Sequence, residues 1–121
     1  MTLASSMIRT FVPGGKDFAA SKAFYAALGF EQIFDAGDVA GFRHGQGEFL
    51  LQNFWNEDYA NNFMMQLIVE DLDAWWAHIA SLDLPERFGV RPPRAPEMMP
   101  WGLREIHLIG PGGELWHIVQ A

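Results

Sequence analysis

The chain has 121 residues and half of them are apolar, which is enough for one domain with a buried core. Its 15 acidic and 8 basic residues give a net charge of −7, and this acidity argues against nucleic acids and anionic membrane surfaces as partners, because both bind through basic side chains. The sequence contains no cysteine, which excludes disulfides, thiolate metal sites and cysteine nucleophiles.

The first half of the chain predicts a strand, a helix and three further strands. We expect a strand over residues 7–12 that ends at Pro13-Gly14-Gly15, because proline cannot donate a hydrogen bond to a sheet and glycine permits a turn. Asp17 is a predicted N-cap and Gly29 a predicted C-cap of the helix between them. The inward face of this helix is expected to hold Phe18, Ser21, Phe24, Tyr25 and Leu28. The next strands are expected at residues 30–34, 39–44 and 48–55.

The second half predicts the same order of elements. After a polar linker over residues 56–62, we expect a strand over 63–69 and a helix that Asp71 or Asp73 caps and that ends near Leu82. Residues 84–102 contain five prolines and are interpreted as an irregular loop, with a short strand near 87–90 and with Arg91 and Arg94 in solvent. The last two strands are expected at 103–109 and 114–120. The repeated order predicts an α+β fold of two βαβββ modules, about 7–55 and 63–120, within one domain of residues 1–121.

The final hairpin predicts a polar surface inside the fold. If residues 111–113 form the loop, Gly110 faces Glu114 and His107 faces His117. Alternation then places Ile106, Leu108, Trp116 and Ile118 on one apolar face, which should pack on a helix. The other face carries Glu105, His107, Ile109, Leu115, His117 and Val119, a composition typical of a cavity lining.

The two histidines leave several interpretations open. His107 and His117 could form a metal pair, an acid/base pair or a hydrogen-bonded pair in a polar pocket. Glu105 could raise the pKa of a histidine, or pair with Arg104 or with a loop backbone.

The module order and two segments carry a resemblance to a known family. The segments are Asp17-Phe18…Ser21…Phe24-Tyr25…Leu28-Gly29-Phe30 and Trp101-Gly102-Leu103-Arg104-Glu105…Gly110-Pro111-Gly112-Gly113-Glu114-Leu115. Over nearly its whole length the chain resembles the glyoxalase / bleomycin resistance / extradiol dioxygenase group, the vicinal oxygen chelate superfamily. The resemblance implies two βαβββ modules that form a curled, partly open mixed sheet around a cavity. It also implies a homodimer in which the first strand can cross to the partner at Pro13.

The metal-dependent branch of that family is a poor match. Its four ion-binding positions, of His, Glu or Gln type, fall here on Thr10, within Leu50–Gln52, on Met64 and on His117. Divalent ions of this kind require three or four nitrogen or oxygen ligands. The chain therefore resembles most the metal-free, bleomycin-resistance-like branch, and we expect no metal and no cofactor.

The resemblance and the residues together give one functional hypothesis. We expect a cytoplasmic, metal-independent protein that binds a cationic or aromatic small molecule, such as a bleomycin-class antibiotic, and so confers antibiotic resistance. The alternative is a metal-dependent lyase, isomerase or dioxygenase of the same superfamily. No catalytic residues are assigned, and no nucleic acid or membrane partner is expected. The predicted ligand-binding residues are Gln52, Asn53, Trp55, Gln66, Trp101, Glu105, His107 and His117.

Overall fold

The structure of the protein, a computed structural model, describes residues 2–121. Met1, the first residue of the predicted 1–121 domain, lies outside the described residues. The first module contains β1 (Thr10–Pro13), α1 (Phe18–Leu28), β2 (Glu31–Asp35), β3 (Val39–His44) and β4 (Gly47–Gln52). After α2 (Glu57–Ala60), the second module contains β5 (Met64–Val69), α3 (Leu72–Ala80), α4 (Leu84–Phe88), β6 (Arg94–Met98), β7 (Arg104–Ile109) and β8 (Leu115–Gln120).

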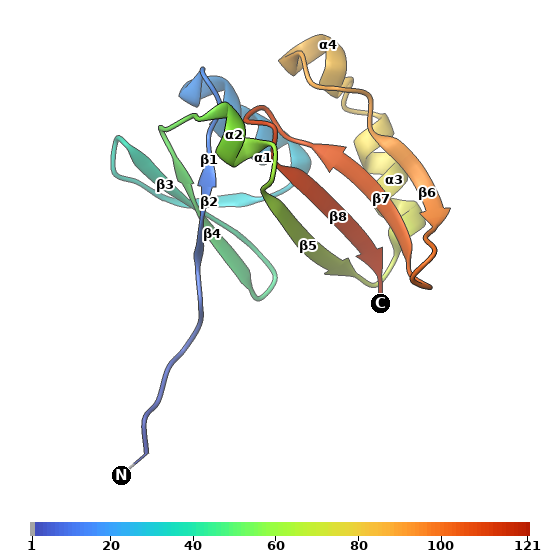
Figure 1. The fold of residues 1–121 in the computed structure, drawn as a ribbon, viewed down its shortest axis with the longest axis horizontal. Helices are drawn as coiled ribbons and strands as arrows, with labels where there is room; N and C mark the ends of the chain where they lie inside the picture. The colour runs from blue at the N-terminus through green and yellow to red at the C-terminus, as the bar shows by residue number, and fades with distance from the viewer. Residues whose placement is uncertain (1) are drawn as a thin grey trace.

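Each module builds one open, four-stranded mixed sheet (Figure 1). Sheet A has the order β1-β4-β3-β2 and sheet B the order β5-β8-β7-β6. In each sheet the first strand pairs in parallel with the last, and the other pairs are antiparallel. The prediction of an α+β fold with two equivalent modules is therefore confirmed.

Helix α1 shows how the sequence sets an element's ends and its buried face. The carboxylate of Asp17 accepts a hydrogen bond from the backbone N–H of Ala20 at 3.1 Å, which satisfies a free donor of the first turn. Gly29 ends the helix with φ 116°, a left-handed conformation that favours glycine. Four of the five residues predicted for the inward face, Ser21, Phe24, Tyr25 and Leu28, are buried, and Phe18 is partly buried against the core.

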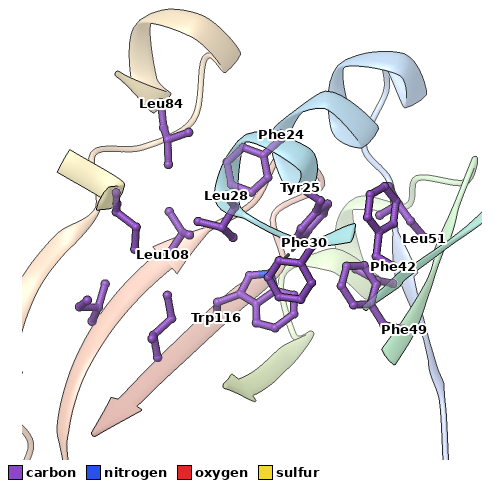
Figure 2. Close-up of a cluster of buried hydrophobic side chains, with 14 of the residues drawn as sticks. Phe24, Tyr25, Leu28, Phe30, Phe42, Phe49, Leu51, Leu84, Leu108 and Trp116 are labelled. Carbon is purple, nitrogen blue, oxygen red and sulfur yellow. Dashed lines mark hydrogen bonds between the residues drawn. The ribbon is translucent and has the colours of Figure 1, made fainter. Parts of the chain in front are cut away.

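One hydrophobic core joins the two modules (Figure 2). Trp116 of sheet B packs against Phe30 and Phe49 of the first module, with ring centroids 5.5 and 5.6 Å apart. The Trp116 indole N–H donates to the Tyr25 hydroxyl at 2.9 Å, and this hydroxyl donates to Glu114 at 2.5 Å. The polar ends of the buried aromatic residues thus have hydrogen-bond partners, as burial requires.

The predicted elements and the structure differ mainly between residues 56 and 98. Asn56 accepts a hydrogen bond from the N–H of Tyr59 and caps the short helix α2, where a linker was predicted. Residues 84–88 form α4 with Pro85 in its first turn, so the expected strand near 87–90 is wrong. The strand of this region is β6 instead, and it pairs with β7 across a register shift between Arg94 and Glu97.

Smaller differences lie at the ends of elements. β1 begins at Thr10 instead of residue 7, and α3 ends at Ala80 instead of near Leu82. None of the helices in residues 2–121 combines the length and the hydropathy needed to span a membrane.

The final hairpin has the predicted register. His107 pairs with His117, and the N–H of Gly110 donates to the carbonyl of Glu114 at 2.8 Å. Ile106, Leu108, Trp116 and Ile118 are all buried, and α3 contacts β6, β7 and β8 on this side. The opposite side of sheet B, here called the open face, carries the other set of alternating residues.

Candidate functional site

A row of polar side chains crosses all four strands on the open face of sheet B. His107 of β7 lies opposite Arg94 of β6 on one side and opposite His117 of β8 on the other. His117 in turn lies opposite Gln66 of β5. Residues that are paired across strands point to the same side of a sheet. The four side chains therefore form one polar row on a face whose other residues include Met64 and Ile68, which are 63% and 64% exposed.

Glu105 is the hydrogen-bonding centre of this site. It is 2% exposed, and its Oε1 lies 2.9 Å from His107 Nε2 and 2.8 Å from His117 Nδ1. Its Oε2 accepts a hydrogen bond from the indole N–H of Trp101 at 2.6 Å. Arg104 does not pair with Glu105, since its guanidinium lies 2.7 Å from Asp73. Of the partners considered for Glu105, the structure therefore shows the histidines and not Arg104.

The hydrogen bonds keep Glu105 ionised although it is buried. Burial on its own raises the pKa of this carboxyl, but hydrogen bonds from His117, Trp101 and His107 outweigh burial and hold the pKa below the ordinary value for glutamate. An ionised carboxylate only accepts hydrogen bonds, so both imidazoles donate to it. Each ring is thereby held in one orientation, and its second nitrogen remains available to a ligand.

Trp101 gives the site an exposed aromatic surface. It follows β6 in the loop before β7, and 58% of its surface is exposed although its N–H is bonded to Glu105. An indole that is held at one end and open on its face is suited to stacking on a planar or cationic ligand. The cavity beside it, of about 380 Å³, is lined by Met64, Met65, Gln66, Trp101, Leu103, Glu105 and His117.

The structure brings only part of the predicted site together. Gln66, Trp101, Glu105, His107 and His117 lie on or beside the open face of sheet B. The remaining predicted residues belong to the first module: Gln52 ends β4 and Asn53 follows it.

Trp55 lies at the junction of the two modules. Its indole N–H donates to the carbonyl of Gly112 at 3.2 Å, and Lys16 Nζ lies 4.5 Å from the centre of its ring. Within one chain, Trp55 therefore helps to attach the loop between β7 and β8 to the first module.

A second cavity lies between the edges of the two sheets. Its volume is about 360 Å³, and its lining includes Thr10, Phe49, Met65 and Trp116. Met64 lines this cavity as well as the one beside Trp101. The family's ion-binding positions on Thr10, Met64 and His117 are therefore spread over two adjoining cavities.

Three groups of the site could in principle hold a metal ion. The nitrogen atoms of His107 and His117 and a carboxylate oxygen of Glu105 lie within 4.8 Å of one another. Ligand atoms at about 2.1 Å from a tetrahedral ion are separated by about 3.4 Å. The separations of 2.8 and 2.9 Å between Glu105 Oε1 and the two imidazoles are those of hydrogen bonds instead. The arrangement therefore fits a satisfied hydrogen-bond network better than a ligand set.

Sequence reasoning did not identify two features of this region. Arg94 was interpreted as solvated because β6 was not predicted, although its pairing with His107 places it in the polar row. Glu114 is fully buried and bonded to Tyr25 of the other module, and no local sequence signal indicates this distant contact.

Comparisons with known proteins agree with this architecture. The sequence model of the Glyoxalase/Bleomycin resistance protein/Dioxygenase superfamily matches residues 11–118. A bleomycin resistance protein of Klebsiella pneumoniae is 31% identical over 110 residues, which cover 87% of this chain and 85% of that protein.

Solved structures show the same fold. A bleomycin-binding protein in complex with bleomycin superposes with a TM-score of 0.80 at 24% identity, over 97% of this chain and 99% of that chain. A bleomycin-binding protein from Streptomyces verticillus in complex with copper(II)-bleomycin gives a TM-score of 0.76 at 23% identity, over 98% and 99% of the two chains. The family match, which extends from β1 to β8, shows that the chain belongs to the Glyoxalase/Bleomycin resistance protein/Dioxygenase superfamily.

Proposed function

We propose that this protein binds and sequesters a cationic or aromatic small molecule of the bleomycin class, without a metal of its own and without chemical conversion. The observation that carries the proposal is the exposed Trp101, which the buried carboxylate of Glu105 holds beside a cavity. The likeness to a bleomycin resistance protein supports the ligand class. The net charge of −7 supports a cationic ligand, since an acidic protein attracts cations over long distances.

The proposed ligand contacts follow from the groups on the open face. Trp101 would stack on planar rings of the ligand, while His107, His117 and Gln66 would supply hydrogen bonds. Met64 would adapt to the shape of the ligand, because its side chain is flexible and polarisable. Glu105 would act mainly by orienting Trp101 and the two imidazoles.

We further propose that the protein acts as a cytoplasmic homodimer. The open face of sheet B leaves Met64 63% and Ile68 64% exposed, and sheet A leaves Phe11 47% exposed. A second copy that covers these side chains would remove apolar surface from water. Pairing of this kind would also allow Gln52, Asn53 and Trp55 of one chain to approach the open face of the other. The sequence is compatible with this location, because a chain without cysteine has no disulfide that would require an oxidising compartment.

Calorimetric titration with metal-free bleomycin tests the proposal. We expect saturable binding to the native protein and about tenfold weaker binding to Trp101→Leu, because a lost stacking contact is worth about 1.4 kcal/mol. Trp75→Phe is the matched control: Trp75 packs on His44 away from the open face, with ring centroids 5.0 Å apart. The proposal would be overturned if no heat of binding is measured up to millimolar bleomycin, or if Trp101→Leu and Trp75→Phe lose the same affinity for bleomycin.

A metal-dependent enzyme of the same superfamily is the second candidate. It is favoured by one observation, the convergence of Glu105, His107 and His117. Elemental analysis of protein purified without chelators separates the two candidates. Stoichiometric zinc, manganese or iron that disappears in His117→Ala would support the enzyme, whereas protein without metal that still binds bleomycin would support sequestration.

A further inference from the structure

A cationic pocket adjoins the polar row at the end of sheet B. It has a volume of about 300 Å³ and is lined by Arg91, Pro92, Arg94, His107, Ile109 and Leu115. Its floor consists of residues on the open face of β7 and β8, and its wall comes from the segment that leads into β6. Two of the eight basic residues of an acidic chain therefore meet in one small cavity beside a histidine.

Arg91 lacks a partner of its own. Within residues 2–121 its side chain makes no ion pair, hydrogen bond or ring contact. Every other basic side chain has one: Arg9 with Glu48, Lys16 with Trp55, Lys22 with Asp35, Arg43 with Glu31, Arg87 with the carbonyl of Leu82, Arg94 with Glu97 and Arg104 with Asp73. In a chain where carboxylates outnumber basic residues almost two to one, an arginine with none of these contacts among the described residues is unexpected.

Arg94 is only weakly engaged. It forms an ion pair with Glu97, three residues further along the chain, with 3.2 Å between Nη2 and Oε2. The side chains of Arg94 and Glu97 are 67% and 56% exposed. Exposed pairs of this kind contribute little, because water screens both charges. Its register position opposite His107 directs it toward the same cavity. Its guanidinium can therefore exchange Glu97 for another anion at small cost.

The backbone around the two arginines limits their movement. Arg91 precedes Pro92, and a residue before proline favours an extended conformation, while the proline ring fixes its own φ. Arg94 is held by the β6–β7 ladder. The buried carboxylate of Glu105 contacts His107 of the lining and is already bonded to His117 and Trp101.

We propose that Arg91 and Arg94, beside His107, form a binding site for an oxyanion: a carboxylate, sulfate or phosphate group. The planar guanidinium groups present parallel N–H donors that match two oxygens of such a group. The site lies on the same face as Trp101 and beside His117, so a ligand that occupies both would carry an aromatic or cationic part and an oxyanion. This inference does not rest on the proposed function, since its probe and its readout differ from those of the bleomycin titration.

The test uses the full-length protein and inorganic phosphate at pH 7, with sulfate as a second probe. The ring proton resonances of His107, assigned with His107→Gln, are followed by NMR during the titration. We expect a saturable shift, and about tenfold weaker binding in Arg91→Gln and in Arg94→Gln, because each variant loses a charged hydrogen-bond donor. Arg43→Gln is the matched control, because Arg43 is exposed on β3 and pairs with Glu31.

Two further measurements complete the test. Phenyl phosphate distinguishes the source of the anion: tighter binding than inorganic phosphate assigns the site to an anionic group of an organic ligand, and weaker binding assigns it to a free ion. Either result supports the site. The proposal is overturned if none of the probes gives a saturable shift of the His107 resonances. It is also overturned if Arg43→Gln loses as much affinity as the Arg91 and Arg94 variants. A change of molecular mass in the Arg91→Gln, Arg94→Gln double variant also overturns it, because the arginines would then belong to a subunit interface.

Discussion

Glu114 shows how one buried side chain links pH to stability. It is inaccessible to solvent, and it accepts hydrogen bonds from Tyr25 and from the N–H of Gly112. Burial raises its pKa from 4.5 to about 7, although both hydrogen bonds act in the opposite direction. The folded state therefore holds the proton of Glu114 at pH values where the unfolded chain has released it.

The free energy of unfolding should consequently fall between pH 4.5 and pH 7. Below this range both states are protonated, and within it only the unfolded state ionises, so stability decreases as the pH rises. A shift from 4.5 to about 7 corresponds to about 3 kcal/mol. Urea unfolding at several pH values should show that the free energy of unfolding of the native protein falls with rising pH. This pH dependence, the slope, should be absent in Glu114→Gln. Glu86→Gln, on the exposed side of α4, should keep the slope, and an unchanged slope in Glu114→Gln would contradict the prediction.

At the scale of elements, the loop between β7 and β8 connects the two modules. Gly112 accepts a hydrogen bond from Trp55, and a Cβ atom added to it would lie 2.7 Å from the carbonyl oxygen of Pro13 and 3.0 Å from the N–H of Gly15. Because both neighbours are backbone atoms, they cannot move out of the way by a rotamer change, as a side chain could. The loop can therefore approach the first module only with a glycine at this position.

Gly112→Ala should destabilise the fold by about 1–3 kcal/mol, the usual cost of overpacking. Gly47→Ala is the control, because its added Cβ would meet only the carbonyl oxygen of His44, at an ordinary 3.5 Å. Its effect should stay within about 0.5 kcal/mol. Thermal unfolding of both variants checks the prediction, and equal losses would show that the approach of the loop to Pro13 is not tight.

The sequence predicted elements whose signals are local and missed those that depend on distant partners. Helix α1 carries its caps and its apolar face within 13 residues, 17–29, and the β7–β8 hairpin carries its own alternation and turn, so both were predicted correctly. Strand β6 contains a proline and is strand only because β7 pairs with it. The same difference applies to the site: the His107–His117 pair follows from the hairpin, whereas the placement of Arg94 needs β6.

At the scale of the whole molecule, the N-terminal segment lacks a packing partner within the chain. Residues 2–8 extend away from both sheets, and Arg9, which pairs with Glu48 of β4, leads into β1 (Figure 1). Leu3 is 91% and Ile8 is 95% exposed, and β1 itself is an edge strand of sheet A. Exposed apolar side chains beside a free strand edge favour association with another chain. A second copy of this protein is the partner that the proposed homodimer supplies.

Ile8→Asp should therefore weaken dimer formation. A charge at this position would have to be buried against the partner, which costs free energy because no opposite charge is there to compensate it. Light scattering after size exclusion should give about twice 13.7 kDa for the native protein, and a mass that falls on dilution for Ile8→Asp. Ser5→Asp adds the same charge to the same segment without replacing an apolar side chain, so it separates burial of Ile8 from general repulsion between two chains of charge −7. A native mass of 13.7 kDa at 100 µM protein would refute the dimer itself, whereas a dimer that tolerates Ile8→Asp would show that the segment lies outside its interface.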